Sequence, residues 1–315
     1  MKVLITGGAG YLGAVIVPRL LSEGHEVAVV DNFMYNQTSL LDCCHYKTLS
    51  VIRADARDER LMQRLMKTVD AILPLACLTG APLCEKEPRQ AEEVILDGVR
   101  LILSLRSSSQ MIIYPTTNSG YGVGEKGVHC TEKTPLRPIS LYGRLKVKAE
   151  EEILNAGNGI TLRLATAFGI SPRMRLDLLV NDFTYRALKF KKIELFESHF
   201  MRNYCHVRDI ADAFAHCLKN FERMKNEAYN VGLSEANLSK RQLCEEIQKH
   251  IPDFQFSESM NAKDPDQRNY IVSNEKIEKT GFKAKVTLSE GIDELIKGFT
   301  VIDHQRETNV KLTNI

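Results

Sequence analysis

The stretch VLITGGAGYLG, residues 3–13, runs from aliphatic residues directly into glycines spaced three apart. Residues 2–6 predict a strand and residues 11–24 predict a helix. Such glycines allow a tight turn, close approach of the backbone to a pyrophosphate and close packing of helix on strand. The helix N-terminus then offers free N–H groups and partial positive charge to phosphates. The positions expected to face a dinucleotide are Gly7, Gly10, Tyr11, Leu12 and Gly13.

Acidic residues end the next two predicted strands. Asp31 closes the strand over residues 25–31. An acid there accepts hydrogen bonds from ribose hydroxyls and repels a 2′-phosphate, which favours NAD over NADP. Asp55 closes the strand over 49–55 and has two interpretations, contact with the adenine amino group or a cap for the helix beginning near Arg57. The expected NAD site also includes Asn32, Ala56, Leu75 and Ala76.

Strands and helices alternate through the first half of the chain. Further strands are predicted at residues 70–76, 110–115 and 160–166, and further helices at 58–69, 88–107 and 141–155. Strands separated by helices imply right-handed crossovers and an α/β fold, a Rossmann-type doubly wound parallel sheet covered on both faces. A smaller mixed α/β substrate-binding cap is expected to follow.

The predicted domain boundary lies where the regular alternation of strands and helices ends. Residues 1–166 form the NAD-binding domain, completed by parts of 202–232, and residues 167–315 mainly bind substrate. Within the second region, residues 202–220 predict a turn entering a helix. The last dozen residues predict a loose tail.

The composition is that of an ordinary globular protein, with 315 residues, 43% of them hydrophobic, and a net charge of +2. A net charge this small gives no long-range electrostatic attraction that would favour nucleic acid or a membrane as partner. We see neither a signal peptide nor a run of 18 apolar residues, and expect a cytoplasmic protein. The eight cysteines are scattered without CxxC pairs or zinc-finger spacing, which predicts free thiols and no metal.

A second motif lies in SLYGRLKVKAE, residues 140–150, where Tyr142 and Lys146 stand four apart. On a helix both side chains project from one face. A tyrosine base requires a pKa about 3 units below its usual value near 10. A lysine ammonium one turn away and a positive nicotinamide ring both favour the phenolate. The pair therefore predicts a general base with its electrostatic partner.

These motifs, in this order, resemble the extended short-chain dehydrogenase/reductase superfamily of nucleotide-sugar epimerases and dehydratases. The resemblance covers about residues 1–300. It implies that Tyr142 is the catalytic base and that Lys146 lowers its pKa and holds the nicotinamide ribose. In that superfamily a Ser or Thr four residues before the YG of the loop shares the substrate hydroxyl with the tyrosine. Here this residue is Thr117, in PTTNSGYG, residues 115–122.

The next two residues of this loop are neutral. Nucleotide-sugar 4,6-dehydratases carry acids just after the threonine, where this chain has Asn118 and Ser119. An amide and a hydroxyl do not titrate near neutral pH and cannot perform the proton transfers of a dehydration. We therefore expect oxidation at C4 of the sugar, either as the final reaction or as half of an epimerisation, with both residues facing the substrate.

The second half is expected to supply the diphosphate ligands. The guanidinium group suits diphosphates because it forms charge-assisted, forked hydrogen bonds. By superfamily position Arg202 and Arg268 are the expected ligands, Asn181 contacts the same moiety, and Arg173 and Arg175 are further candidates.

The whole chain resembles, within this superfamily, the bacterial GDP-heptose 4-dehydrogenases of capsule biosynthesis, which oxidise C4 of GDP-D-glycero-α-D-manno-heptose. The resemblance is carried by segments such as RNYCHVRD, residues 202–209, and NLSKRQLCE, residues 237–245. It implies tightly bound NAD(H), 2-oxoglutarate as a recycling oxidant, and a homodimer through helices near 88–107 and 141–155. One departure is Ile95, which stands where the superfamily has Asn.

Two other functions stay open. A 4-epimerase uses the same first step and then returns hydride to the opposite face of the ketone, and no residue distinguishes it from a dehydrogenase. A non-catalytic NAD-binding regulator is the alternative from another class. Such proteins typically lose the tyrosine or the lysine, whereas this chain keeps both.

Overall fold

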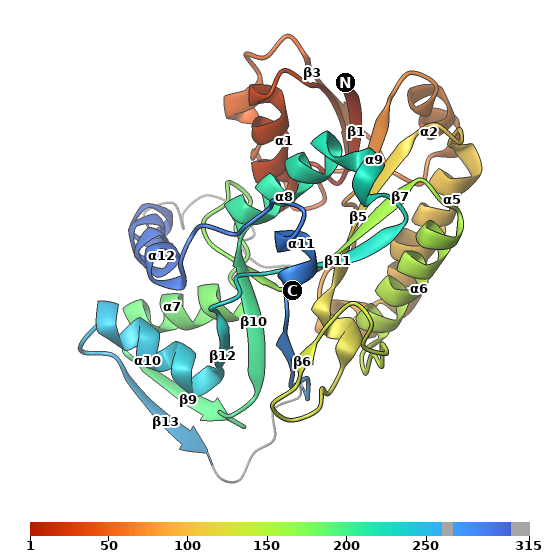
Figure 1. The fold of residues 1–315 in the computed structure, drawn as a ribbon. Helices are drawn as coiled ribbons and strands as arrows, with labels where there is room; N and C mark the ends of the chain where they lie inside the picture. The colour runs from red at the N-terminus through yellow and green to blue at the C-terminus, as the bar shows by residue number, and fades with distance from the viewer. Residues whose placement is uncertain (260–266, 304–315) are drawn as a thin grey trace.

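The computed structural model describes residues 1–259 and 267–303. The predicted tail, residues 304–315, lies outside the described residues. Figure 1 shows a large sheet with helices on both sides and, beside it, a smaller lobe built around α7, α10 and α12.

The large sheet has seven parallel strands in the order β11-β7-β5-β4-β1-β2-β3. The Rossmann-type α/β fold predicted from the alternation is confirmed. The strands are β1 Lys2–Thr6, β2 Glu26–Asp31, β3 Leu49–Arg53, β4 Ala71–Pro74, β5 Met111–Thr117, β7 Gly159–Leu164 and β11 Glu227–Val231. Because β11 pairs with β7, a strand from the second half of the chain forms one edge of this sheet.

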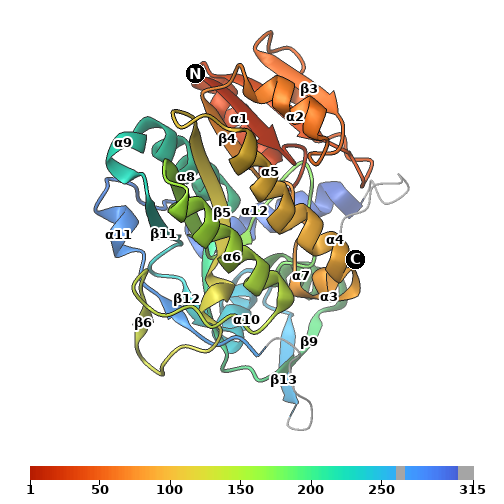
Figure 2. The same ribbon diagram turned by 90° about the vertical axis from the view of Figure 1, so that its right-hand side faces the viewer.

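Helices cover both faces because successive strand residues point to opposite sides. On β1, Ile5 packs with α1 (Gly13–Ser22) and α8 (Val207–Lys219), whereas Leu4 packs with the helices of the other face. Those are α2 (Glu59–Met66), α5 (Gly98–Leu105) and α6 (Leu141–Asn155), which face the viewer in Figure 2. All residues of β1 from Val3 to Thr6 are buried, as expected for a strand covered on both faces.

The single helix expected over 88–107 is interrupted. The chain forms α3 (Ala81–Lys86), α4 (Pro88–Glu92), a π-helical segment over Glu93–Asp97, and then α5. Ile95 lies inside the π-helical segment and is 1% exposed, packed in the core between α5, α6 and the sheet. The position that carries Asn in the superfamily is therefore an apolar core position here.

The smaller lobe contains three short sheets and most of the remaining helices. Its strands are β8 Thr166–Phe168 with β10 Met201–His206 and β12 Asn237–Ser239, β9 Lys192–Phe196 with β13 Gln255–Ser259, and β6 His129–Cys130 with β14 Ile271–Val272. Its helices are α7 Leu179–Phe190, α10 Lys240–His250, α11 Glu275–Glu278 and α12 Leu288–Asp303, while α9 Phe221–Met224 leads into β11.

The predicted turn at the start of 202–220 is wrong, since residues 202–206 belong to strand β10. Tyr204 and Cys205 point to opposite faces and are both 0% exposed. A strand buried on both faces lacks the polar–apolar alternation by which a strand is recognised in sequence.

All eight cysteines are free, as predicted, and six of them are buried. Among residues 1–259 and 267–303, no helix has the length and hydropathy required to span a bilayer.

Candidate active site

A cavity of about 1190 Å³ opens at the carboxyl ends of β1, β2, β4 and β5. The strand order reverses between β1 and β4, and ligands of doubly wound sheets bind at such a switch point. The volume exceeds the range of about 300–1,000 Å³ that suits one small molecule. Its wall contains the predicted cofactor residues Gly7, Gly10, Tyr11, Leu12, Gly13, Asp31, Asn32, Asp55, Ala56, Leu75, Ala76, Tyr142 and Lys146.

The glycine loop forms a cradle that any side chain would fill. Gly7 has φ +70°, and a Cβ there would lie 2.6 Å from the backbone nitrogen of Ala76. A Cβ on Gly13 would lie 2.4 Å from the carbonyl oxygen of Gly8, so α1 packs directly on the loop. The helix thus presents its first free N–H groups to the cavity, and this arrangement fits a dinucleotide pyrophosphate.

Asp31 is 8% exposed at the end of β2 and braces the glycine loop. Its carboxylate accepts hydrogen bonds from the backbone N–H of Ala9 (3.0 Å) and of Phe33 (2.8 Å). Burial raises the pKa of Asp31, and these two N–H groups oppose that shift. Gln37 Nε2 also donates to Oδ1 at 3.3 Å, so Asp31 is fixed at the cavity wall with a lone pair of Oδ2 left for a ribose hydroxyl.

Asp55 also lines the cavity, but it does not cap a helix. Its carboxylate forms an ion pair with Arg57 at 2.7 Å, and Arg57 also contacts Glu93 at 2.7 Å. The N-cap of α2 is Asp58, which accepts a hydrogen bond from Leu61 N at 3.0 Å. The capping interpretation of Asp55 is therefore wrong.

Tyr142 and Lys146 project from the first turns of α6 into the cavity. Lys146 is 3% exposed and donates hydrogen bonds to the carbonyl oxygen of Pro115 (2.9 Å) and to Tyr114 Oη (3.1 Å). Burial raises the pKa of Tyr142, and the positive charges of Lys146 and Arg175 oppose that rise. In the protein alone the tyrosine is therefore protonated at neutral pH.

Thr117 ends β5 and starts the turn that the predicted active-site loop forms. Its hydroxyl donates a hydrogen bond to Ser119 Oγ at 2.9 Å and accepts one from Ser119 N at 3.1 Å. Arg268 also donates to Ser119 Oγ. Thr117, Ser119, Arg268 and Tyr142 all line the cavity, so residues far apart in sequence meet at one wall.

A glycine cradle, an acid ending β2 and a tyrosine–lysine pair thus share one cavity. The model of the NAD dependent epimerase/dehydratase family matches residues 3–232, most of the chain. The chain belongs to the NAD-dependent epimerase/dehydratase family. Its cofactor is NAD, and the cradle and Asp31 are the residues that would hold it.

Curated relatives of this chain are named as nucleotide-sugar enzymes. A probable UDP-arabinose 4-epimerase of Oryza sativa is 27% identical over 73% of this chain, which spans 63% of that relative's length. UDP-glucuronic acid decarboxylase 6 of Arabidopsis thaliana is 26% identical over 93% of this chain and 87% of its own. The relatives therefore include more than one reaction type.

Solved structures share the whole fold of this family member. UDP-glucose 4-epimerase of Thermus thermophilus, solved with NAD, is 25% identical with a TM-score of 0.81, covering 95% of this chain and 99% of its own. UDP-glucuronic acid 4-epimerase of Bacillus cereus, solved with UDP-glucuronic acid and NAD, has a TM-score of 0.85 at 19% identity, covering 96% and 100%. The second likeness shows the fold alone.

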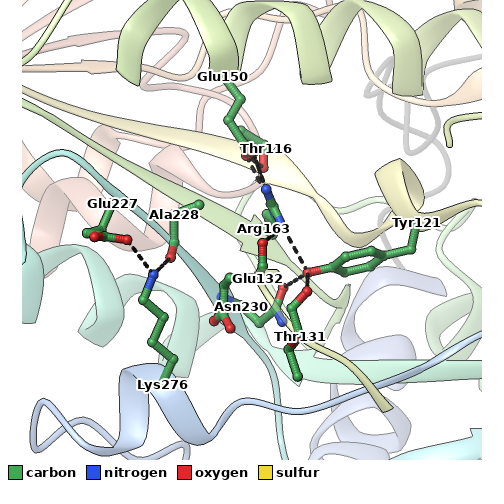
Figure 3. A network of polar contacts seen from close by, with 10 residues as sticks. All are labelled: Thr116, Tyr121, Thr131, Glu132, Glu150, Arg163, Glu227, Ala228, Asn230 and Lys276. Carbon is green, nitrogen blue, oxygen red and sulfur yellow. Dashed lines mark hydrogen bonds and ion pairs between the residues drawn. The ribbon is translucent and has the colours of Figure 1, made fainter. Parts of the chain in front are cut away.

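A buried polar network supports the wall of the candidate active site (Figure 3). Glu150, one turn beyond Lys146 on α6, forms an ion pair with Arg163 of β7 at 2.6 Å, with side-chain exposures of 3% and 8%. Glu150 also accepts a hydrogen bond from Thr116 at 2.9 Å, and Arg163 donates to Tyr121 Oη at 3.1 Å. The helix with Tyr142 is thereby joined to the strand that ends at Thr117.

The predicted substrate residues divide into two groups. Thr117, Ser119, Arg173, Arg175, Arg202 and Arg268 line the cavity. Asn118 and Asn181 lie behind the wall, 1% and 0% exposed. The Asn181 amide donates to the carbonyl oxygen of Arg175 (2.9 Å) and accepts from Gly169 N (3.0 Å). It also donates to Tyr11 Oη at 3.4 Å, and this bond joins the smaller lobe to the glycine loop.

Other cavity residues escaped sequence reasoning. Tyr35 lies after β2, and its ring packs against the Arg173 guanidinium at 4.4 Å. Lys240, 4% exposed at the start of α10, lines the cavity near Arg202 and Arg268. Tyr35 belongs to no motif. Lys240 lies in the segment 237–245 that carries part of the resemblance, directly after Ser239, a helix N-cap, but it was given no role.

Proposed function

We propose that this enzyme oxidises C4 of a nucleotide-diphospho-sugar to the 4-keto sugar. One observation carries the proposal: Tyr142, Lys146 and Thr117 line the same cavity as the glycine cradle. A base, its electrostatic partner and a hydroxyl that orients the substrate are the groups that alcohol oxidation requires. The carbon–hydrogen bond is broken by NAD, which when bound accepts hydride.

Each residue of the proposed site has its own role toward the substrate. The Thr117 hydroxyl accepts or donates a hydrogen bond at the C4 hydroxyl, and Tyr142 Oη takes its proton. Lys146 stabilises the phenolate, and the positive nicotinamide ring of bound NAD would act in the same direction. Both charges are needed because burial alone raises the tyrosine pKa. Arg202 and Arg268, which line the same cavity beside the active-site loop, bind the substrate diphosphate.

The uncharged side chains of Asn118 and Ser119, next to Thr117, support a reaction that ends at the 4-keto sugar. Ser119 Oγ is hydrogen bonded to Thr117 and Arg268, and the Asn118 amide is buried. Neither group takes or gives a proton near pH 7. Elimination of water across C5–C6 therefore lacks its acid and base.

For the substrate we propose GDP-D-glycero-α-D-manno-heptose, with 2-oxoglutarate recycling the reduced cofactor and a homodimer as the working unit. The support is the likeness of segments such as residues 202–209 to GDP-heptose 4-dehydrogenases. The presence of epimerases among the relatives favours a second candidate, a UDP- or GDP-sugar 4-epimerase with a transient 4-keto intermediate.

The deciding experiment is incubation with a panel of GDP-, UDP-, dTDP- and CDP-sugars, with and without 2-oxoglutarate, read by mass spectrometry. A dehydrogenase releases a product two hydrogens lighter. An epimerase returns an isomer of unchanged mass, seen by NMR, and needs no oxidant. Loss of water would contradict both.

The Tyr142→Phe variant separates an enzyme from a regulator. It is expected to bind NAD and substrate while its turnover falls by about 10²–10⁴-fold, the usual contribution of a positioned base. Tyr46→Phe, outside the cavity wall, is the matched control. Wild-type turnover in Tyr142→Phe would contradict the catalytic assignment.

A further inference from the structure

Residues 169–177, hereafter the strap, connect the smaller lobe to the glycine loop. The Tyr11 hydroxyl donates a hydrogen bond to the carbonyl oxygen of Gly169 at 2.8 Å. In return, Ser171 Oγ donates to the carbonyl oxygen of Tyr11 at 2.8 Å. Both bonds are buried. The strap therefore lies against the turn whose N–H groups face the cofactor pyrophosphate.

Two arginines of the strap face the cofactor side of the cavity. Arg173 is 2% exposed, and its guanidinium packs on the ring of Tyr35 at 4.4 Å, within electrostatic range of Asp31. Arg175 is 9% exposed, forms an ion pair with Asp177, and lies within electrostatic range of Tyr11 and Tyr142. Tyr35, Asp31 and Tyr11 all belong to the nucleotide-binding half of the chain.

The electrostatics of the strap point to an anion. Burial lowers the pKa of Arg173, and the adjacent charge of Arg175 lowers it further. Two guanidinium groups held together in a buried wall are costly unless negative charge offsets them. Asp31 and Asp177 supply part of that charge. A pyrophosphate in the cradle would supply two further negative charges and would suit the forked donors of arginine.

The second pair of arginines lies elsewhere in the cavity. Arg202 donates to the carbonyl oxygen of Arg268 and packs on the ring of Tyr270 at 5.5 Å, and Arg268 donates to Ser119. This pair faces the active-site loop and the smaller lobe. The cavity thus holds one arginine pair beside the glycine loop and another beside Thr117, and the reaction brings two diphosphates, one in NAD and one in the sugar nucleotide.

We propose that Arg173 and Arg175 bind the pyrophosphate of NAD, so that the strap retains the cofactor between turnovers. This assignment replaces the substrate role that the sequence suggested for these two arginines. It rests on the NAD cofactor and not on the sugar or reaction proposed above. Release of NAD then requires the strap to separate from Tyr11, which explains how a cofactor can remain bound while substrate and product exchange.

The test compares Arg173→Met with Arg202→Met as the matched control. Each protein is stripped of cofactor, and its affinities for NAD and for GDP and UDP are measured by calorimetry. Loss of a charge-assisted hydrogen bond predicts a Kd for NAD raised about 10- to 100-fold in Arg173→Met, with affinity for GDP and UDP unchanged. Arg202→Met should show the opposite pattern. Retained NAD(H) per protomer after desalting should fall in Arg173→Met alone.

The proposal is overturned if Arg173→Met binds NAD as the wild type does, or if it loses affinity for GDP or UDP instead. Thermal unfolding of the stripped proteins checks the fold. If Arg173→Met does not fold, Arg173→Lys decides, because it keeps the charge and loses the fork. An intermediate loss of NAD affinity supports the proposal, and wild-type NAD affinity in Arg173→Lys contradicts it.

Discussion

The hydroxyl of Thr117 donates a 2.9 Å hydrogen bond to Ser119 Oγ, two residues further along the same loop. Arg268 donates to that same oxygen from a segment distant in sequence. Ser119 therefore connects the proposed substrate-orienting hydroxyl to a proposed diphosphate ligand. In 4,6-dehydratases, acids occupy the places of Asn118 and Ser119.

Replacing Ser119 by Ala should misplace the Thr117 hydroxyl and the Arg268 guanidinium, which both donate hydrogen bonds to Ser119 Oγ. Removal of a hydrogen bond to a charged donor costs about 1.5–3 kcal/mol, so we expect kcat/KM for the sugar nucleotide to fall about 10- to 100-fold. NAD affinity should not change. Ser104→Ala, an exposed serine on α5, is the matched control for steady-state kinetics. Wild-type kcat/KM in Ser119→Ala would contradict this role.

Replacing Lys146 by Met should move the pH dependence of turnover. Lys146 lowers the pKa of Tyr142 against the effect of burial, so its removal raises that pKa further. The rising limb of the kcat–pH profile should then shift upward by about 1–3 pH units. Lys148→Met, on an exposed position of the same helix, should leave the profile in place. A downward or absent shift in Lys146→Met would refute the electrostatic role.

Replacing Glu150 by Gln should destabilise the protein far more than replacing Glu152 by Gln. The first change leaves the buried guanidinium of Arg163 without its carboxylate partner, at a cost of about 3–5 kcal/mol. Glu152, on the same helix, pairs with the solvent-exposed Arg100, so its loss should change the free energy of unfolding little. Urea denaturation measures both free energies of unfolding. Equal values would show that the buried pair adds no more than the surface pair.

The ion pairs of Glu294 should contribute stability that acid removes. Burial raises the pKa of this carboxyl, but the nearby charges of His206 and Arg208 and a hydrogen bond from Arg208 outweigh burial and lower it from 4.5 to about 2. Because the folded pKa is the lower one, the contribution is present above pH 4.5 and disappears as the pH falls towards 2.

The Glu294→Gln variant measures this contribution. Its melting temperature should lie below that of the wild type at pH 7, and the difference should shrink as the pH approaches 2.5. Glu245→Gln, at an exposed pair with Arg241, should show little difference at any pH. A wild-type–variant difference that is constant with pH would contradict the role of the carboxylate charge.

Much of the fold could be predicted because local patterns decide it. Glycines at 7, 10 and 13 admit few alternatives to the strand–turn–helix found at β1 and α1. The helix predicted over about 141–155 is confirmed as Leu141–Asn155, and Ser140 caps it by accepting a hydrogen bond from Gly143 N. The strand β10 was missed because burial on both faces removes the alternation of polar and apolar residues, and the π-helical segment over Glu93–Asp97 leaves no local signal.

The sequence by itself determined the Rossmann-type sheet, the NAD cradle and the spacing of Tyr142 and Lys146, because each depends on neighbours within a few residues. Only the tertiary structure decided which residues each arginine contacts: Arg173 packs on Tyr35, and Arg268 donates to Ser119. The strap and Arg268 reach the site from distant parts of the chain, and their positions follow from packing between lobes. Contacts such as Tyr11 with Gly169 and Arg173 with Tyr35 have no counterpart in a local pattern.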